Sequence, residues 1–169
     1  MPHFVRSPNP TVKGGYRSFR PFVRADFSSQ CAYCLMSEPF AGGEENFELD
    51  HFRPKKRFPD LWNDFYNLYY SCHPCNFTKL DHWPADELQS RGVMLVDLCK
   101  DEFATHFSAE PSGELIGLTE SGKYTIHLLR LNRRHLVRLR RLLFELGLSP
   151  HKERVGEDEL TSLANRLGK

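Results

Sequence analysis

Four cysteines occur as two pairs of identical spacing, Cys31-x-x-Cys34 and Cys72-x-x-Cys75. Two such pairs, brought together by a fold, supply the four thiolates of a tetrahedral zinc ion. Because four sulfur ligands leave no open position, an ion held in this way is structural. The spacing therefore predicts a structural Zn²⁺ site in which all four cysteines are ligands.

Between the two pairs, Asp50 and His51 stand at the end of a predicted strand over residues 46–49. Hydrolysis of a phosphodiester needs a nucleophilic water, a base that deprotonates it and positive charge at the phosphate. Histidine is suited to proton transfer near neutral pH, so we assign His51 as the general base. In a regular strand the two side chains point to opposite sides, but a turn before Pro54 would bring both to one cleft.

The order of these residues resembles that of the HNH endonuclease family, the zinc-stapled members of the ββα-metal nucleases. The matching positions lie within residues 31–84 and are Cys31, Cys34, Asp50, His51, Pro54, Asn67, Leu68, Cys72, Cys75, Asn76 and Lys79. The resemblance implies an α+β fold with a ββα-metal core, and hydrolysis of DNA phosphodiester bonds. RNA is an alternative substrate.

The resemblance also implies roles for polar residues around the predicted base. Asp50 matches a metal ligand, and its hard oxygen suits Mg²⁺ or Mn²⁺. Asn67 matches the asparagine that holds the loop and the histidine in position. Asn76 stands where many members have a last histidine, and an amide oxygen is also a ligand for Mg²⁺. Lys79, one helical turn later, would place an ammonium on the same face, suited to contact a phosphate.

Three further segments extend the resemblance to HNH proteins of bacterial mobile-element and defence loci. These segments are Trp83-Pro84, Gly117-Leu118-Thr119 and Leu131-Asn132-Arg133. Some small HNH nucleases of this kind accompany an ATPase partner in anti-phage systems, so the resemblance implies such a partner. This sequence contains no glycine-rich nucleotide-binding loop of its own.

Basic residues are clustered, although the formal net charge is only +1. Local patches of positive charge attract phosphates whatever the sum over the chain. One patch lies before Asp26 and another follows His51, and a third lies near the carboxyl end, over residues 130–141. We predict nucleic-acid contacts for Arg17, Arg20, Arg24, Arg53, Lys55, Lys56 and Arg57. The alternative for each patch is an ordinary solvated surface.

A length of 169 residues with 40% hydrophobic residues predicts one globular domain. We expect the chain to divide into four parts. These are a basic, partly extended arm over 1–27, the zinc-stapled core over 28–88, a strand and two-helix extension over 89–150, and a polar tail over 151–169. The arm has a composition that is compatible with ordering only on binding. The fifth cysteine, Cys99, is expected to pack as a small apolar side chain.

Turn and cap signals define the extension. A hairpin is expected between residues 103–109 and 114–118, followed by helices that begin near Thr119 and Asn132. In the last helix, apolar and basic residues lie on opposite faces. The apolar residues are Leu136, Leu139, Leu143 and Leu146, and the basic ones are Arg134, Arg138 and Arg141.

Two functions fit these patterns. The first is a metal-dependent endonuclease, and the second is a catalytically silent zinc-ribbon module that binds nucleic acid or a partner protein. No signal segment is recognised and no apolar run approaches the length of a membrane span. Cysteines that serve as metal ligands also fit a reducing compartment. We therefore expect a cytoplasmic location and no membrane contact.

Overall fold

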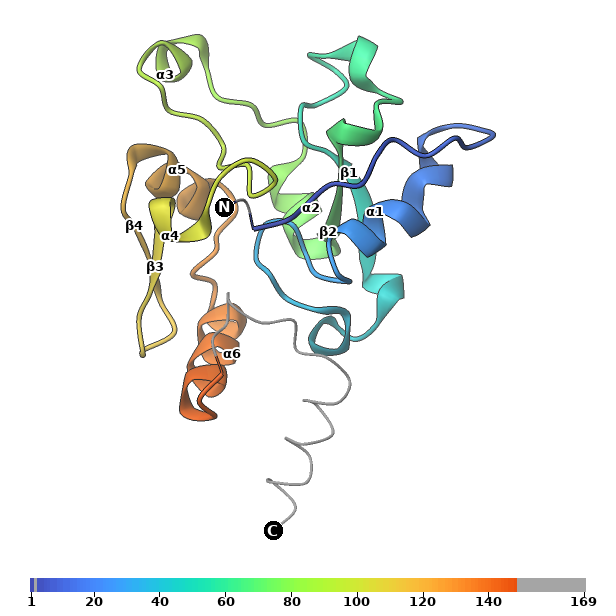
Figure 1. Cartoon of the computed structure of the whole chain (residues 1–169). Helices are drawn as coiled ribbons and strands as arrows, with labels where there is room; N and C mark the ends of the chain where they lie inside the picture. Colours follow the sequence, from blue (N-terminus) through green and yellow to red (C-terminus); the bar gives the residue numbers. More distant parts are fainter. Residues whose placement is uncertain (2, 149–169) are drawn as a thin grey trace.

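The computed structural model describes residues 1 and 3–148 and has a mixed α+β fold (Figure 1). Two small antiparallel sheets are present, and their strands are β1 (Phe47–His51) with β2 (Leu68–Cys72), and β3 (Phe107–Ala109) with β4 (Leu115–Gly117). The α+β class predicted from the sequence is confirmed. The predicted tail, residues 151–169, lies outside the described residues. Within the described part, no helix is both long enough and apolar enough to cross a membrane.

Short helices connect and cover these sheets. They are α1 (Arg20–Asp26), α2 (His73–Lys79), α3 (Asp86–Ser90), α4 (Phe103–His106), α5 (Glu120–Leu128) and α6 (Arg134–Glu145). Single 3-10 turns cover Tyr16–Phe19, Glu38–Ala41, Glu44–Asn46, Pro59–Leu61 and Phe65–Asn67. Figure 1 shows α1 on one side of the first sheet and the β3–β4 hairpin with α5 on the other.

Strand β2 forms the centre of the hydrophobic core. All five of its residues are buried, and Leu68 and Tyr70 are completely enclosed. Aromatic residues favour strands because they pack well on a pleated surface. The buried tyrosine hydroxyls are satisfied, since Tyr70 donates to Glu38 at 2.6 Å and Tyr69 donates to Asp97. Strand β1 pairs with β2 so that Asp50 lies opposite Tyr69, and α2 follows β2 directly and contacts both strands.

The segment before α1 is held on this core by one buried arginine. Arg6 donates to the carboxylate of Asp26 at 2.9 Å and to the backbone carbonyls of Phe65 and Leu68 at 2.8 and 3.0 Å. Its guanidinium also lies 4.5 Å from the centre of the Phe65 ring. Residues 3–15 contain no helix or strand, and these three hydrogen bonds from Arg6 attach the segment to the core.

The extension contains the expected hairpin and two helices, with two differences. The first expected strand, over residues 103–109, is shorter, because Phe103–His106 form α4 and only Phe107–Ala109 form β3. Thr119 caps α5 by accepting a hydrogen bond from the backbone nitrogen of Gly122 at 3.0 Å. The expected cap at Asn132 is wrong, because α6 begins at Arg134 without a side-chain cap. The side chain of Asn132 instead binds both backbone groups of Leu115 in β4, at 2.8 and 2.9 Å. The edge of a strand offers a donor and an acceptor together, which suits a carboxamide better than a helix end does.

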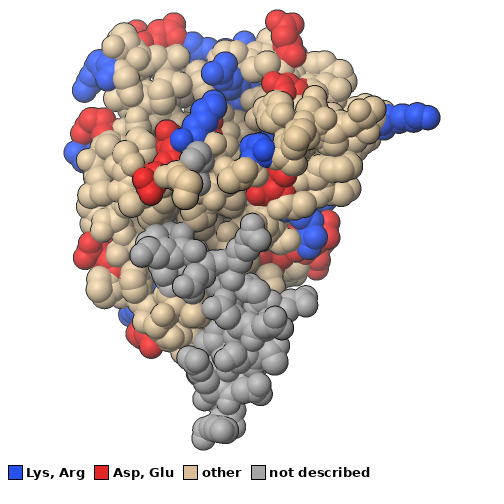
Figure 2. All heavy atoms as spheres, viewed as in Figure 1, with Lys and Arg blue, Asp and Glu red and all other residues tan. Residues whose placement is uncertain are grey.

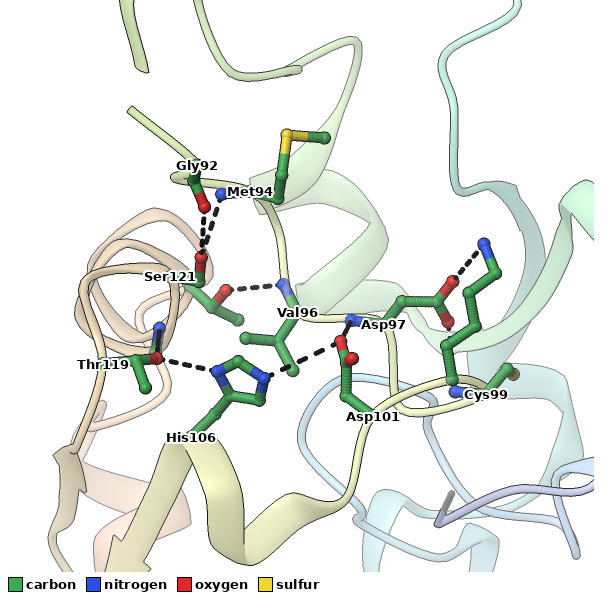
Figure 3. Close-up of polar contacts among 12 residues, drawn as sticks. Gly92, Met94, Val96, Asp97, Cys99, Asp101, His106, Thr119 and Ser121 are labelled. Atoms are coloured by element: carbon green, nitrogen blue, oxygen red, sulfur yellow. Dashed lines mark hydrogen bonds and ion pairs between the residues drawn. The ribbon is translucent and has the colours of Figure 1, made fainter. Parts of the chain in front are cut away.

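Polar contacts attach the segment between α3 and α4 to α5 (Figure 3). The hydroxyl of Ser121 accepts from the backbone nitrogen of Met94 at 3.0 Å, and that of Thr125 accepts from Val96 at 3.0 Å. His106 lies 2.7 Å from the Thr119 hydroxyl through Nδ1. These bonds fix α5 and the following turn relative to the core, which determines where the residues after α5 lie.

Candidate zinc centre and catalytic pocket

The four paired cysteines meet at one point. Their sulfur atoms all lie within 4.8 Å of one another, and the cysteines are free of disulfides. Cys34 Sγ and Cys72 Sγ are 3.7 Å apart. In a tetrahedral site with Zn–S bonds of 2.3 Å, neighbouring sulfurs are separated by about 3.8 Å. The cluster predicted from the sequence is therefore present, and its dimensions fit a zinc ion.

Arg133 from the extension lies against this cluster. Its Nη2 donates to Cys75 Sγ at 3.2 Å and to Cys72 Sγ at 3.9 Å, while Nη1 donates to the backbone carbonyl of Leu129 at 3.1 Å. Four thiolates around a divalent ion carry excess negative charge, which a guanidinium offsets. Sequence reasoning grouped Arg133 with phosphate-binding arginines, but here it joins the start of α6 to the cysteine centre.

We predict that Arg133→Met loses zinc faster than the wild type. The substitution keeps most of the side-chain volume but removes the charge and the donors to sulfur, and changes at such outer positions typically weaken metal binding about 10- to 100-fold. Zinc transfer to a chromogenic chelator measures the release rate. Arg134→Met is the matched control, because Arg134 is exposed. Equal release rates for the two variants would remove Arg133 from the zinc centre.

A separate hollow of about 610 Å³ runs along β1 and α2. It brings together several residues singled out from the sequence. Its polar lining includes Tyr16, Arg17, Arg20, Glu48, Asp50, His51, Lys55, His73 and Asn76. Asp50 and His51 thus reach the same hollow even though they are neighbours in a strand, because the strand ends at His51.

The position of the His51 ring determines which nitrogen carries hydrogen. Nε2 lies 2.8 Å from the backbone carbonyl of Trp62, and a carbonyl oxygen only accepts, so Nε2 donates. In the neutral ring, Nδ1 then keeps its lone pair. The ring also packs edge-on against Tyr16, with centroids 4.9 Å apart. The imidazole ring is therefore held in one orientation. Sequence reasoning missed the contact with Trp62 because a backbone carbonyl leaves no sequence signal.

Asn67 holds the loop that carries this carbonyl. Its Oδ1 accepts from the backbone nitrogen of Arg53 at 2.8 Å, and its Nδ2 donates to the carbonyls of Arg53 and Leu61 at 3.0 and 3.2 Å. One buried carboxamide thereby joins both ends of the loop between the strands. This arrangement suits the positioning role that the resemblance implies for Asn67.

We expect Asn67→Asp to lower the free energy of unfolding by about 3 kcal/mol, because a carboxylate would face two carbonyl oxygens that have lost their donor. Urea denaturation measures the change. Asn46→Asp is the control, since the Asn46 amide also donates to a carbonyl, that of Ala41, but at an exposed position. If both variants lost the same small amount, the loop would not depend on Asn67.

Asp50 is buried and already has partners. Lys79 Nζ lies 3.0 Å from its Oδ2, and the hydroxyl of Tyr33 donates to the same oxygen. Burial raises the pKa of the Asp50 carboxyl, and the Lys79 ammonium acts in the opposite direction. Lys79 is fully enclosed and also donates to the backbone carbonyl of His51 at 2.8 Å. In this structure Lys79 therefore positions Asp50 and His51, and its expected contact with a phosphate stays a prediction without support from its location.

Glu48 and Asp81 are acidic residues of the hollow that sequence reasoning missed, and Glu48 lies beside predicted site residues. Glu48 accepts from His73 Nδ1 at 2.9 Å and from the side-chain nitrogen of Asn76, so the Asn76 oxygen is turned away from that carboxylate. The hydrogen bond from His73 lowers the pKa of Glu48. Strand alternation was the available signal, because it places Glu48 on the same face as Asp50. Carboxylate and amide oxygens are the hard ligands that Mg²⁺ and Mn²⁺ prefer.

The basic residues predicted to bind nucleic acid fall into three groups. Arg17, Arg20 and Lys55 line the hollow, and Arg20 is also paired with Glu44 at 3.4 Å. Arg24 binds Glu38 at 2.6 Å and Arg57 pairs with Asp86, so both already have anionic partners. The remaining two, Arg53 and Lys56, do not line it. Figure 2 shows basic and acidic side chains interspersed over the visible face. Nucleic-acid binding by these residues stays a prediction.

Comparison with known proteins gives two matches, both from Bacillus mycoides (strain KBAB4). The chain is 25% identical over 143 residues to Septu protein PtuA and 26% identical over 148 residues to Septu protein PtuB. The chain is distantly similar to Septu proteins. Each match covers 70% of the chain but only 20% of PtuA and 48% of PtuB, so the chain spans about half or less of each relative's length. No family model matches the chain.

Proposed function

We propose that this protein is a metal-dependent HNH-type endonuclease in which β1, β2 and α2 form the ββα-metal core. His51 acts as the general base through Nδ1 and removes a proton from the attacking water. The observation that carries the proposal is the hydrogen bond from His51 Nε2 to the Trp62 carbonyl at 2.8 Å, in a hollow that also holds a hard donor set. The carbonyl holds the ring in one orientation and leaves Nδ1 as the proton acceptor.

Asp50 and Asn76 would hold the catalytic Mg²⁺ or Mn²⁺, and Glu48 stands beside them as a further oxygen donor. When bound, such an ion supplies positive charge that stabilises the scissile phosphate and the departing oxygen. To bind the ion, the Asp50 carboxylate would have to give up a contact with Lys79 or Tyr33, which are its present partners. Arg17, Arg20 and Lys55 at the rim would attract the nucleic-acid backbone.

We place this activity in anti-phage defence, with DNA as the substrate. Two independent lines support this setting: the resemblance to HNH proteins of defence loci and the distant similarity to Septu proteins PtuA and PtuB. A partner protein such as an ATPase belongs to the same proposal, as does the cytoplasmic location.

The second candidate is the catalytically silent zinc module that binds nucleic acid or a partner protein. One observation favours it: among the residues described, the four cysteines are the only His, Cys, Asp or Glu cluster with ligand atoms close enough to hold an ion. The carboxylates of the hollow are instead bound to Lys79 and to His73.

Incubation of zinc-loaded protein with supercoiled plasmid separates the two candidates. Parallel reactions contain Mg²⁺, Mn²⁺ or a chelator of both, and a labelled RNA replaces the plasmid in a further set. Nicking that requires Mg²⁺ or Mn²⁺ supports the endonuclease. Binding of DNA without nicking under every condition, with or without a co-expressed partner, supports the silent module.

A further inference from the structure

A second hollow of about 780 Å³ lies on the other side of α2, between this helix and the turn that joins α5 to α6. Its lining contains His82, His127, Arg130 and Arg133, and no Asp or Glu among the residues that the structure describes. The catalytic hollow, in contrast, contains several acids. A concave surface with cations and without acids attracts anions.

Arg130 is held in a strained backbone conformation at the edge of this second hollow. Its φ is +49°, in the left-handed region where glycine or asparagine usually ends a helix. The backbone nitrogen of Leu131 bonds to the carbonyl of Ile126 at 3.0 Å, which closes α5 around this position. The arginine side chain does not favour this conformation, whereas glycine does because it has no Cβ atom. Strained residues occur often at functional sites, and Arg130 shares its positive φ with Ser28, Ser29, Leu35 and Leu80, so its place in the hollow carries the argument.

The side chain of Arg130 is also available. It is exposed and forms no hydrogen bond or ion pair with any other described residue, and the same holds for His127. Arg133 differs, because its guanidinium is bound to the cysteine sulfurs and to the Leu129 carbonyl. Arg130 therefore brings to this hollow a permanent positive charge that is not paired with any other described residue.

Phe77 connects the two hollows. It is 67% exposed on α2 and lines both of them. Its ring lies parallel to that of His73, with centroids 6.3 Å apart and an interplanar angle of 27°. An exposed aromatic between two hollows can stack on a base while the nucleic-acid backbone continues on either side.

We propose that the second hollow is a nucleic-acid subsite, in which Arg130 and His127 bind the phosphates that lie across Phe77 from the His51 hollow. This inference rests on the proposed nuclease function and adds the path of the bound strand. The strand would run from the acidic, metal-binding side of α2 over Phe77 to the acid-free side.

Arg130→Gly tests this proposal because its effects on folding and binding are expected to have opposite signs. Glycine adopts the left-handed conformation without strain, so the melting temperature should stay the same or rise. Fluorescence anisotropy with a labelled DNA duplex, in a His51→Ala background without divalent ions, should show about threefold to tenfold weaker binding. The dependence of log affinity on log salt should become shallower by about one unit.

The controls separate this inference from the proposed function. Arg138→Ala removes an exposed arginine from α6 outside both hollows and should leave binding unchanged. Arg130→Asn, which also tolerates the left-handed region, should reproduce the loss. If Arg130→Gly binds like its parent while Arg17→Ala binds weakly, the second subsite is wrong and the catalytic hollow stands. If no variant binds DNA, the parent included, both proposals fail.

Discussion

The His51→Ala variant is expected to nick plasmid DNA about 10²- to 10⁴-fold more slowly than the wild type, the range typical for the loss of a general base. The ring is oriented by the Trp62 carbonyl and Tyr16, so alanine removes the proton acceptor and leaves its surroundings in place. The rate is measured with protein in excess over plasmid. DNA affinity should change little, because the proposed role of His51 is proton transfer and not attraction of the phosphates.

His135→Ala is the matched control for this prediction, because His135 is an exposed histidine on α6 outside the hollow. It should nick at close to the wild-type rate. If His51→Ala kept the wild-type rate, the activity would belong either to another residue or to a contaminating nuclease. Loss of DNA binding by His51→Ala would instead indicate that the hollow had collapsed.

Removal of zinc is expected to abolish the cooperative unfolding transition of the core. Structural zinc contributes about 10 kcal/mol or more to the folding of small metal-stapled units. The cluster joins the loop after α1, the end of β2 and the first turn of α2. Strand β2 pairs with β1, which carries Asp50 and His51, and α2 carries Asn76. Thermal unfolding followed by circular dichroism, with metal content measured on the same samples, should show that Cys75→Ser and chelator-treated protein behave alike.

Cys99→Ser is the control, since Cys99 lies outside the cluster. Burial raises the pKa of the Cys99 thiol to about 11, so this cysteine is a poor thiolate at neutral pH. Its replacement should leave the zinc content intact. An unchanged melting temperature in metal-free protein would show that the four sulfurs are not a structural centre.

Features with local sequence signals were predictable. The spacing of the cysteines indicated their cluster, and this prediction is confirmed. The threonine cap at Thr119 and the β3–β4 hairpin were also found, because a cap and a hairpin involve residues close in the chain. The predicted opposite faces of α6 are also present, since Arg134 and Arg138 are exposed and Leu136 is buried.

Features that depend on distant partners were missed. Arg6, Arg133 and Arg140 all resemble surface cations in the sequence. In the structure Arg6 and Arg140 bind backbone carbonyls and Arg133 binds sulfur, at separations of up to 62 residues along the chain. Arginine can satisfy several acceptors at once, so its burial cannot be deduced from its charge. The Asn132 cap failed for the same reason, because β4 offered a better partner.

The enclosed ammonium of Lys79 has a consequence for how the molecule is built. Because it already balances the charge of Asp50, the strand that bears the base has no unpaired carboxylate to destabilise it before any divalent ion arrives. Folding would then depend on zinc, and the proposed catalysis on Mg²⁺ or Mn²⁺. Under the proposed function, the protein would fold before the catalytic Mg²⁺ or Mn²⁺ binds.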